Sequence, residues 1–334
     1  MAKHSPAVRL DRAIDALLVS LKPEAEPKPS AAIERLMPIA TALRDLPRPD
    51  FKGLLRSELQ RRTTMSEGTA AATESSGKMD FRPQGFNNIA PYFLVNGAAK
   101  FIEFLGAAFE GAEGFRVPGP DGAIMHAEVR IGDSVVELAE ANEEYPTRPM
   151  TTHLYVPDSD AAYARAIDAG ATSVYAVADQ HWGDRQGCVK DAFGNVWYVA
   201  TPKGWIPGAE GIRAVQPFLH LHNAHDIIPF FVAAFGAEAM DVAKSAEGLV
   251  LHATIKIAGA TFEVEEAHGE FQPRPAYLHV YVPDTDAVYA RAVRAGAVSM
   301  RPPSDAPYGD RAAVVKDPFG NTWFLATYRG KKQA

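Results

Sequence analysis

The 334-residue chain has a single cysteine, no long hydrophobic run and no cluster of basic residues. One cysteine, Cys188, excludes an intrachain disulfide and a zinc site built from several cysteines. No run of about 18 apolar residues and no hydrophobic signal segment stand out, so we expect a cytoplasmic protein without a membrane partner. The net charge is −7, from 34 Lys and Arg against 41 Asp and Glu, so we expect no nucleic-acid partner.

One stretch of the chain is present twice. Residues 91–203 and 217–329 align at a constant offset of 126 without an insertion. HLYVPDSDAAYARAIDAGA in the first copy corresponds to HVYVPDTDAVYARAVRAGA in the second, and GDRQGCVKDAFGNVWYVAT to GDRAAVVKDPFGNTWFLAT. Positions identical in both copies are those that each fold unit needs, and positions that differ are where two pockets can differ.

The repeats divide the chain into parts. Residues 1–65 carry apolar residues at helical spacing and predict short amphipathic helices, whereas residues 66–79 are small and polar and predict a flexible linker at 66–84. Two domains follow, 85–204 and 213–330. Short helices need a partner surface for their apolar stripes. The first part is therefore a helical accessory domain, a module that binds a partner protein or forms a homodimer, or a helix at a membrane surface.

Each repeat alternates twice between strands and a helix. In the first copy we predict strands at 89–95, 124–131, 134–141 and 151–158, helices near 98–110 and 160–171, and two last strands around the turn AFGN. The pattern favours an α+β fold in which each repeat is a pair of βαβββ modules, four modules in all.

Strand parity separates the polar side chains from the apolar ones. If Gly132-Asp133 is a two-residue turn, residue 130 opposes 135 and residue 128 opposes 137. The apolar face must then pack on the helices, and the polar face must look into water or a cavity. The polar faces carry a histidine, a glutamate eleven residues later and a His-x-Tyr pair on the next strand: His126, Glu137, His153 and Tyr155 in the first copy, and His252, Glu263, His279 and Tyr281 in the second.

The first strands of the two repeats differ most. The second copy offers Gln216, Phe218 and His220 where the first offers Ala90, Tyr92 and Leu94. The second pocket is therefore the more polar one and the better place for chemistry. The predicted ligand-binding residues are Gln216, Phe218, His220, Tyr277, Tyr281, His126, Glu137, His153 and Tyr155.

The motifs PYFLV with its following AAF helix, MHAEVRIGDSVVEL, GDR and VKDPFGNTW resemble those of the vicinal oxygen chelate (VOC) superfamily. This superfamily includes glyoxalase I, bleomycin-resistance proteins and dioxygenases, and the motifs are most similar to its PhnB-like branch. The resemblance covers about residues 85–329 in two tandem copies. It implies that two modules form a cupped mixed sheet whose concave side holds a small-molecule ligand.

The resemblance also implies where a metal would bind. Metal-dependent relatives place four ligands in the cup, and those positions hold Ala90, Glu137, Thr151 and Tyr198 in the first repeat and Gln216, Glu263, Tyr277 and Phe324 in the second. These residue types do not make a divalent site with three or four protein ligands, so we expect no cofactor. A displaced site built from His252, Glu263 and His279, with or without His220, stays open as the alternative.

Several functions remain open on the sequence alone. The leading hypothesis is a small-molecule-binding protein or metal-independent enzyme acting on a small oxygenated or aromatic metabolite. Its catalytic residues would be Glu263 with His252 or His279 as proton shuttle. The alternatives are a metal-dependent enzyme of the glyoxalase or dioxygenase type, a drug-sequestering resistance protein, and a regulatory protein with vestigial pockets. The sequence does not settle whether the chain is a lyase, an isomerase, a dioxygenase or no enzyme. The GDR motifs predict a salt bridge within the loop that each motif forms, or else a contact of Arg185 or Arg311 with an anionic ligand.

Overall fold

The computed structural model of the chain describes residues 81–83, 85–203, 213–269 and 271–330. The helices predicted for residues 1–65, and most of the linker predicted for 66–84, lie outside the described residues. None of the helices in the described part is both long and apolar enough to cross a membrane.

The two repeats form the same elements in the same order. The first repeat contains β1 (Ile89–Val95), α4 (Ala98–Phe109), β2 (Ala112–Pro118), η3 (Pro120–Gly122), β3 (Ile124–Ile131), β4 (Ser134–Glu140), β5 (Thr151–Tyr155), α5 (Ser159–Asp168), β6 (Thr172–Asp179), β7 (Arg185–Lys190) and β8 (Val196–Thr201). The second contains β9 (Val215–Leu221), α6 (Ala224–Phe235), β10 (Glu238–Lys244), β11 (Val250–Ile257), β12 (Ala260–Glu266), β13 (Tyr277–Tyr281), α7 (Thr285–Arg294), β14 (Val298–Asp305), β15 (Arg311–Lys316) and β16 (Thr322–Thr327). The α+β fold with four βαβββ modules is confirmed.

The predicted hairpin parity is confirmed. Arg130 pairs with Val135 and Glu128 pairs with Glu137, so the turn between β3 and β4 is two residues long. Gly132 has a φ of 58° in that turn, a conformation that glycine adopts without steric cost. The second hairpin keeps the same register, with Thr254 opposite Glu263.

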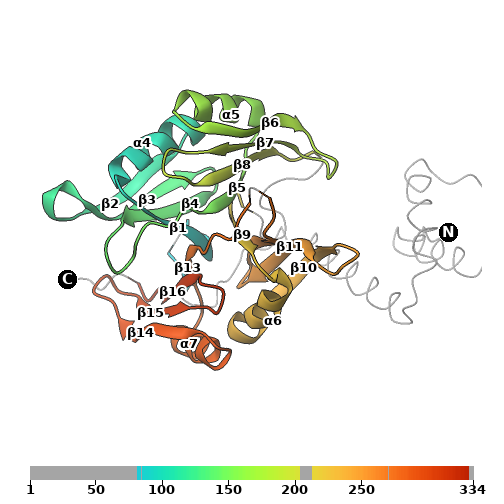
Figure 1. Cartoon of the computed structure of the whole chain (residues 1–334). Coiled ribbons are helices and arrows are strands. Elements are labelled where there is room, and N and C mark those ends of the chain that lie inside the picture. The colour runs from blue at the N-terminus through green and yellow to red at the C-terminus, as the bar shows by residue number, and fades with distance from the viewer. Residues whose placement is uncertain (1–80, 84, 204–212, 270, 331–334) are drawn as a thin grey trace, which may run out of the picture. The chain divides into compact units, whose positions relative to one another are not determined.

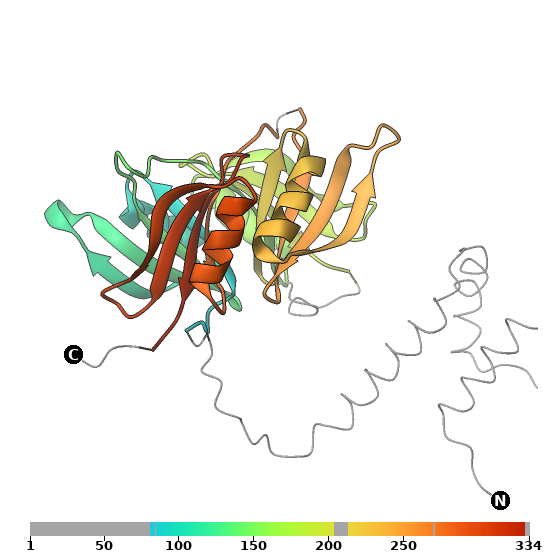
Figure 2. The same ribbon diagram turned by 90° about the horizontal axis from the view of Figure 1, so that it is seen from below.

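The strands of the two repeats are exchanged between two eight-stranded mixed sheets. Sheet 1 has the order β14-β15-β16-β13-β1-β4-β3-β2, and sheet 2 has the order β10-β11-β12-β9-β5-β8-β7-β6. Each sheet therefore joins the first module of one repeat to the second module of the other (Figure 1, Figure 2). The central joints are antiparallel, between β1 and β13 and between β5 and β9. The polar face of each sheet therefore combines strands of both repeats. The prediction of one pocket per repeat is wrong.

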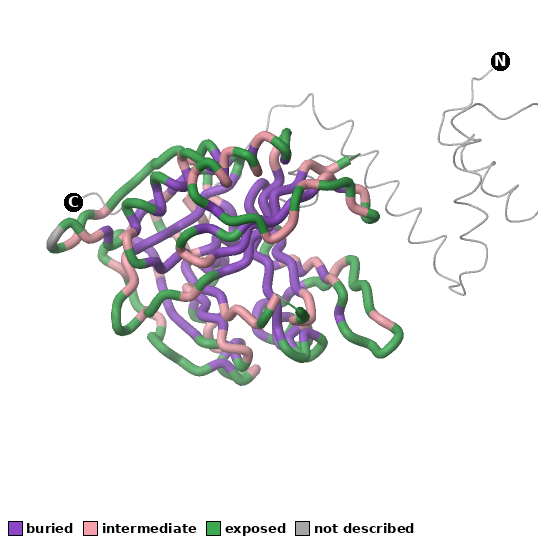
Figure 3. The backbone as a smooth tube through the Cα atoms, turned by 45° about the horizontal axis from the view of Figure 1, so that its top comes forward, coloured by how far each residue is buried: buried purple, intermediate pink, exposed green. Residues whose placement is uncertain are grey.

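The two helices of each repeat pack against each other, although the two modules of the repeat contribute their strands to different sheets. In Figure 1, α4 and α5 of the first repeat lie side by side, and α6 packs against α7 in the second. Trp197 of β8 stacks on Phe93 of β1 at 5.4 Å and contacts Phe109 of α4, so strands from different sheets share one apolar core. Figure 3 shows the central strands buried and the outer hairpins exposed. The polar strand faces opposite the helices are left to form the site.

Candidate functional site

Two candidate sites, one in each sheet, lie on the strand faces opposite the helices, which we call helix-free faces. We call the helix-free face of sheet 1 "site 1" and that of sheet 2 "site 2". Small apolar clusters separate from the main core line them: Leu94, Ala139 and Tyr277 in site 1, and Cys188, Val196, Tyr198 and Phe218 in site 2. Every site thus combines side chains of both repeats.

A glutamate and a histidine from different repeats meet in site 1. Nδ1 of His279 on β13 lies 2.7 Å from both carboxylate oxygens of Glu137 on β4. Glu137 is only 2% exposed, so little water competes for its carboxylate. Among the described residues, Nε2 of His279 has no hydrogen-bond partner. The carboxylate therefore fixes one side of the imidazole ring and leaves the other nitrogen available.

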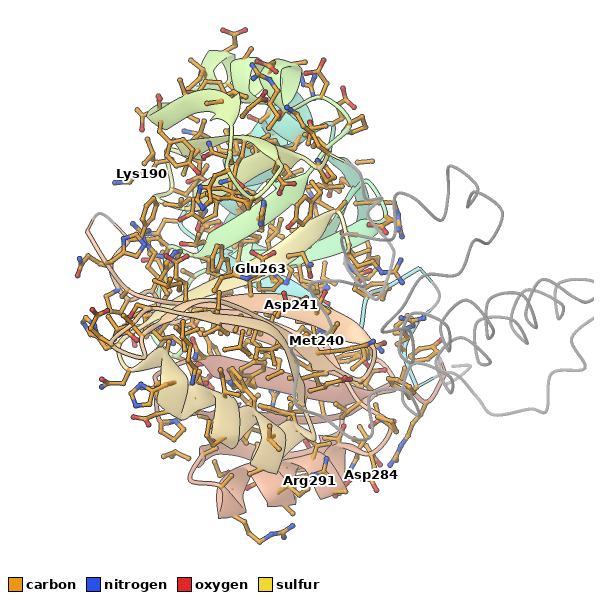
Figure 4. The ribbon with its side chains drawn as sticks, turned by 90° about the vertical axis from the view of Figure 1, so that its right-hand side faces the viewer. Lys190, Met240, Asp241, Glu263, Asp284 and Arg291 are labelled. Carbon is orange, nitrogen blue, oxygen red and sulfur yellow. The ribbon has the colours of Figure 1, made fainter. Side chains whose placement is uncertain are left out.

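The same pair recurs in site 2. Nδ1 of His153 on β5 lies 3.0 and 3.2 Å from the carboxylate oxygens of Glu263 on β12. The hydroxyl of Tyr155 donates to Glu263 at 3.1 Å, and Nε2 of His252 lies 3.8 Å from the same carboxylate. Nε2 of His153 is buried and has no partner among the described residues. Figure 4 labels Glu263, which lies well inside the ribbon, whereas Asp284 and Arg291 lie at its lower edge with α7.

In site 1 the two members of the pair stabilise each other's charge. Burial alone would raise the pKa of Glu137, but the charge of His279 and its hydrogen bond lower that pKa below the ordinary value. Burial likewise opposes the charged form of His279, yet the Glu137 carboxylate raises the pKa of this imidazole. Burial alone would also raise the pKa of Glu263, but the charges and hydrogen bonds of His153 and His252 lower that pKa below its ordinary value. The glutamates are therefore held ionised beside the imidazoles.

Each GDR motif supplies an aspartate whose charge acts on groups of a site, and neither aspartate was predicted as a site residue. Asp310 is 4% exposed, and burial raises the pKa of its carboxyl to about 6, against the opposing charge of His279. Its counterpart Asp184 influences the pKa of Tyr155, as does Glu263. The occurrence of GDR in both repeats was the signal that could have found them.

The salt bridge predicted within each GDR motif is wrong. Arg311 binds Asp286 and Asp305, and Arg185 binds Asp160 and Asp179, all of them exposed partners on neighbouring elements. Because each arginine begins a strand directly after its aspartate, the two side chains point to opposite faces. Each arginine therefore binds carboxylates outside its own motif.

The sites differ in their aromatic lining. In site 2 the rings of Tyr155, His153, Phe218, His220 and Phe271 follow one another with centroid distances of 4.1, 6.4, 4.7 and 5.4 Å. His220 is fully buried, and burial lowers its pKa to about 3. The hydroxyl of Tyr198 lies 3.3 Å from its Nε2. Site 1 has Leu94 in place of His220, so it lacks this continuous stack.

The structure separates the predicted catalytic residues. His252 and Glu263 lie together in site 2, but His279 belongs to sheet 1 and contacts Glu137 instead. The expected group of three is therefore wrong as one site, because strand exchange moves β13 to the other sheet. The predicted ligand-binding residues divide accordingly. Gln216, Phe218, His220, His153 and Tyr155 line site 2, and Tyr277, Tyr281, His126 and Glu137 line site 1.

The residues do not fit a catalytic metal ion. Strand exchange groups the four metal positions as Ala90, Glu137, Tyr277 and Phe324 in site 1 and as Gln216, Glu263, Thr151 and Tyr198 in site 2. Glu263 is already held by His153, and Gln216 Oε1 accepts a hydrogen bond from Thr261. Among the described residues, no cluster of three or more His, Cys, Asp or Glu side chains could hold a metal ion. The displaced set with His279 cannot form across two sheets.

A cavity of about 230 Å³ lies at the end of β1 beside the turn between β7 and β8. It is lined by Leu94, Val95, Asn96, Thr147, Arg148, Pro149, Ala192, Phe193 and Asn195. None of these residues belongs to a Glu–His pair, so the cavity lacks the titratable groups of both sites. Arg148 is already engaged there, since it donates to Gly320 O at 3.1 Å and lies 4.5 Å from the ring centre of Tyr277.

Comparison with known proteins agrees with this architecture. A sequence model of the Glyoxalase/Bleomycin resistance protein/Dioxygenase superfamily matches residues 85–199 and 222–325. The chain belongs to this superfamily. The match falls on both repeats, so this VOC protein carries two tandem copies of the family domain. The PhnB-like branch stays a prediction.

Individual relatives cover either one repeat or both. Uncharacterised proteins of Mycobacterium bovis and Mycobacterium tuberculosis are 42% identical over 125 residues, which cover 34% of this chain and 82% and 74% of theirs. The crystal structure of glyoxalase I from Zea mays matches with a TM-score of 0.55 and 13% identity, over 72% of this chain and 92% of that one. At this identity the likeness concerns the fold alone.

Proposed function

We propose that each helix-free face binds a small oxygenated or aromatic molecule. In site 1, side chains add a proton to one atom of this molecule and remove a proton from another, without a metal ion. The observation that carries the proposal is the buried Glu137–His279 pair, whose Nε2 is left without a partner among the described residues. A carboxylate that holds Nδ1–H orients an imidazole for proton transfer at Nε2.

Site 1 contains both a proton donor and a proton acceptor. The raised pKa of His279 keeps more of this imidazole protonated near neutral pH, so Nε2–H can give a proton to a ligand oxygen. Asp310, whose pKa of about 6 lies near neutrality, takes a proton from another atom of the ligand. The ligand gains one proton and loses one, which is the balance of an isomerisation, or of an elimination in which the leaving group takes up the donated proton.

Site 2 supports a second function, the holding of a ligand without turnover. In site 2, Nε2 of His153 is buried, and a continuous series of rings offers stacking area for a planar molecule. Glu263 has a pKa far below its ordinary range, which makes this carboxylate a weak base. Site 2 therefore favours affinity over proton transfer.

The test is proton exchange measured on the full chain in the presence of a chelator. A panel of small carbonyl and phenolic compounds is incubated in D2O with the protein, and loss of their exchangeable C–H signals is followed by ¹H NMR. We expect exchange that His279→Gln and Asp310→Asn reduce by about 10²-fold or more. Exposed Glu103 on α4 provides the control Glu103→Gln, which should change nothing. Exchange that survives both site variants, or that the chelator abolishes, would contradict the proposal.

A further inference from the structure

Arg301 lies in the same row of residues as His279 on the face of sheet 1. Across the neighbouring strands, Arg301 is paired with Val314, Val314 with Phe324, and Phe324 with His279. Side chains directly opposite one another in neighbouring strands point to the same face of a sheet. Arg301 therefore belongs to site 1, at the outer end of the row that carries the proposed proton donor.

The backbone of β14 is irregular at this position. The register shifts both before and after Arg301, between Ser299 and Arg301 and between Arg301 and Ser304. Such bulges redirect a side chain and are frequent beside functional sites. Sheet 2 has Tyr175 in the equivalent place, opposite Cys188, and its hydroxyl accepts a hydrogen bond from Gln186 at 2.6 Å. The two sites thus differ by a positive charge.

Arg301 differs from several other surface arginines of the described residues, which bind a carboxylate. Arg311 and Arg329 bind Asp305, and Arg185 binds Asp160 and Asp179. Among the described residues, no carboxylate or carbonyl oxygen bonds to Arg301.

The positive charge of Arg301 acts on the phenols of Tyr92 and Tyr145 in site 1. Burial raises the pKa values of Tyr92 and Tyr145, and the positive charge of Arg301 opposes this in both cases. The phenols therefore remain protonated at neutral pH and can donate hydrogen bonds. The ring of Phe324 lies 5.1 Å from Tyr92 and 5.6 Å from Tyr145, which completes an aromatic floor.

We propose that Arg301 is the anion-recognising residue of site 1, so that the ligand of this site carries a carboxylate next to an aromatic body. The inference rests on the proposed function, because it names the ligand class of the same site. A guanidinium forms two parallel hydrogen bonds with a carboxylate, and the neighbouring phenols add further donors. Site 2, with Tyr175 in this place, takes an uncharged planar molecule.

The experiment compares two probes of equal shape, 4-hydroxybenzoate and 4-hydroxybenzamide, on the full ¹⁵N-labelled chain by NMR titration. Arg301→Gln should weaken 4-hydroxybenzoate at site 1 about tenfold and leave 4-hydroxybenzamide unchanged, and Arg301→Lys should retain part of the affinity. The control is Arg294→Gln, which removes the same charge from an exposed residue on α7. It should alter neither probe.

The failures of the two proposals are distinguishable. If Arg301→Gln leaves 4-hydroxybenzoate unchanged, or weakens both probes equally, while His279→Gln weakens both, the anion subsite is wrong and the site stands. If neither probe shifts the amides of β1, β13 and β14, the ligand site itself is wrong and the subsite falls with it.

Discussion

Nδ1 of His279 lies 2.7 Å from the carboxylate of Glu137, although 142 positions separate the two residues in the chain. His153 and Glu263, 110 positions apart, repeat the contact in the other sheet. Each pair exists only because the modules of the two repeats are exchanged. The duplication therefore does more than supply two domains, since neither repeat contains a complete pair.

The first prediction concerns the titration of His279. Replacing Glu137 by Gln removes the carboxylate but keeps the burial, so the pKa of His279 should fall from above its ordinary value of 6.5 to below it. The measurement is an NMR titration of the imidazole C–H signals. Glu103→Gln, an exposed change on α4, should leave the titration as it is. An unchanged His279 pKa in Glu137→Gln would mean that the pair does not form in solution.

The second prediction concerns His220 and the pH dependence of stability. The pKa of His220 in the folded chain is about 3, below its ordinary value of 6.5. Between these pH values the imidazole is therefore protonated in the unfolded chain and neutral in the folded chain. This titration therefore leaves the free energy of unfolding unchanged above pH 6.5 and decreases it as the pH falls below 6.5. His220→Leu uses the side chain that the chain itself places at the equivalent position 94.

His220→Leu should therefore reduce the loss of unfolding free energy between pH 7 and pH 5 by about 2 kcal/mol. Urea unfolding at the two pH values measures this difference directly, whatever the substitution costs at pH 7. Equal losses in the variant and the wild type would show that His220 is not held neutral.

The third prediction concerns the turn between β15 and β16. Asp317 is 4% exposed and accepts four hydrogen bonds, from the amides of Phe319 and Asn321, the side chain of Asn321 and the indole of Trp323. Asp317→Ala leaves these donors unpaired in the interior and should destabilise the protein by about 3–5 kcal/mol in urea unfolding.

The matched comparison is Arg311→Gln, which breaks two exposed ion pairs and should cost less than about 1 kcal/mol. The opposite ranking, with Arg311→Gln the more costly change, would contradict the view that buried hydrogen bonds and not surface charges hold these turns.

The fourth prediction concerns a single repeat. Residues 81–203 alone leave β1 without β13 and β5 without β9, so two inner strands become exposed sheet edges. Two copies can restore both joints by pairing with each other. We expect a homodimer in size-exclusion chromatography with light scattering. A monomer with well-dispersed NMR signals at low concentration would show that the cross-repeat joints are dispensable.

The sequence predicted elements with a clear alternation of apolar and polar residues. The faces of β3 and β4 follow parity, so Ala127, Val129 and Leu138 were placed in the core and Glu137 in the site. The strands β2, β6, β10 and β14 were not located, because they are outer strands exposed on both faces and show no alternation. Arg301 was missed for the same reason, since it lies on β14.

The exchange of modules was not predictable from one sequence. The strands TTHLYV and YLHVYV carry the same pattern, so either could pair beside either first strand with the same polar face inward. Nothing in the local pattern decides between pairing within a repeat and pairing across repeats. The sequence therefore identified the side chains of the sites but combined His279 with the wrong glutamate.

The most direct test of the account is a crystal structure of the full chain soaked with 4-hydroxybenzoate. We predict electron density on the helix-free face of sheet 1, with the phenolic oxygen at Nε2 of His279 and the carboxylate at Arg301, and with Glu137 still bound to Nδ1. Density only in the cavity beside Arg148, or Glu137 and His279 pointing away from each other, would contradict the account.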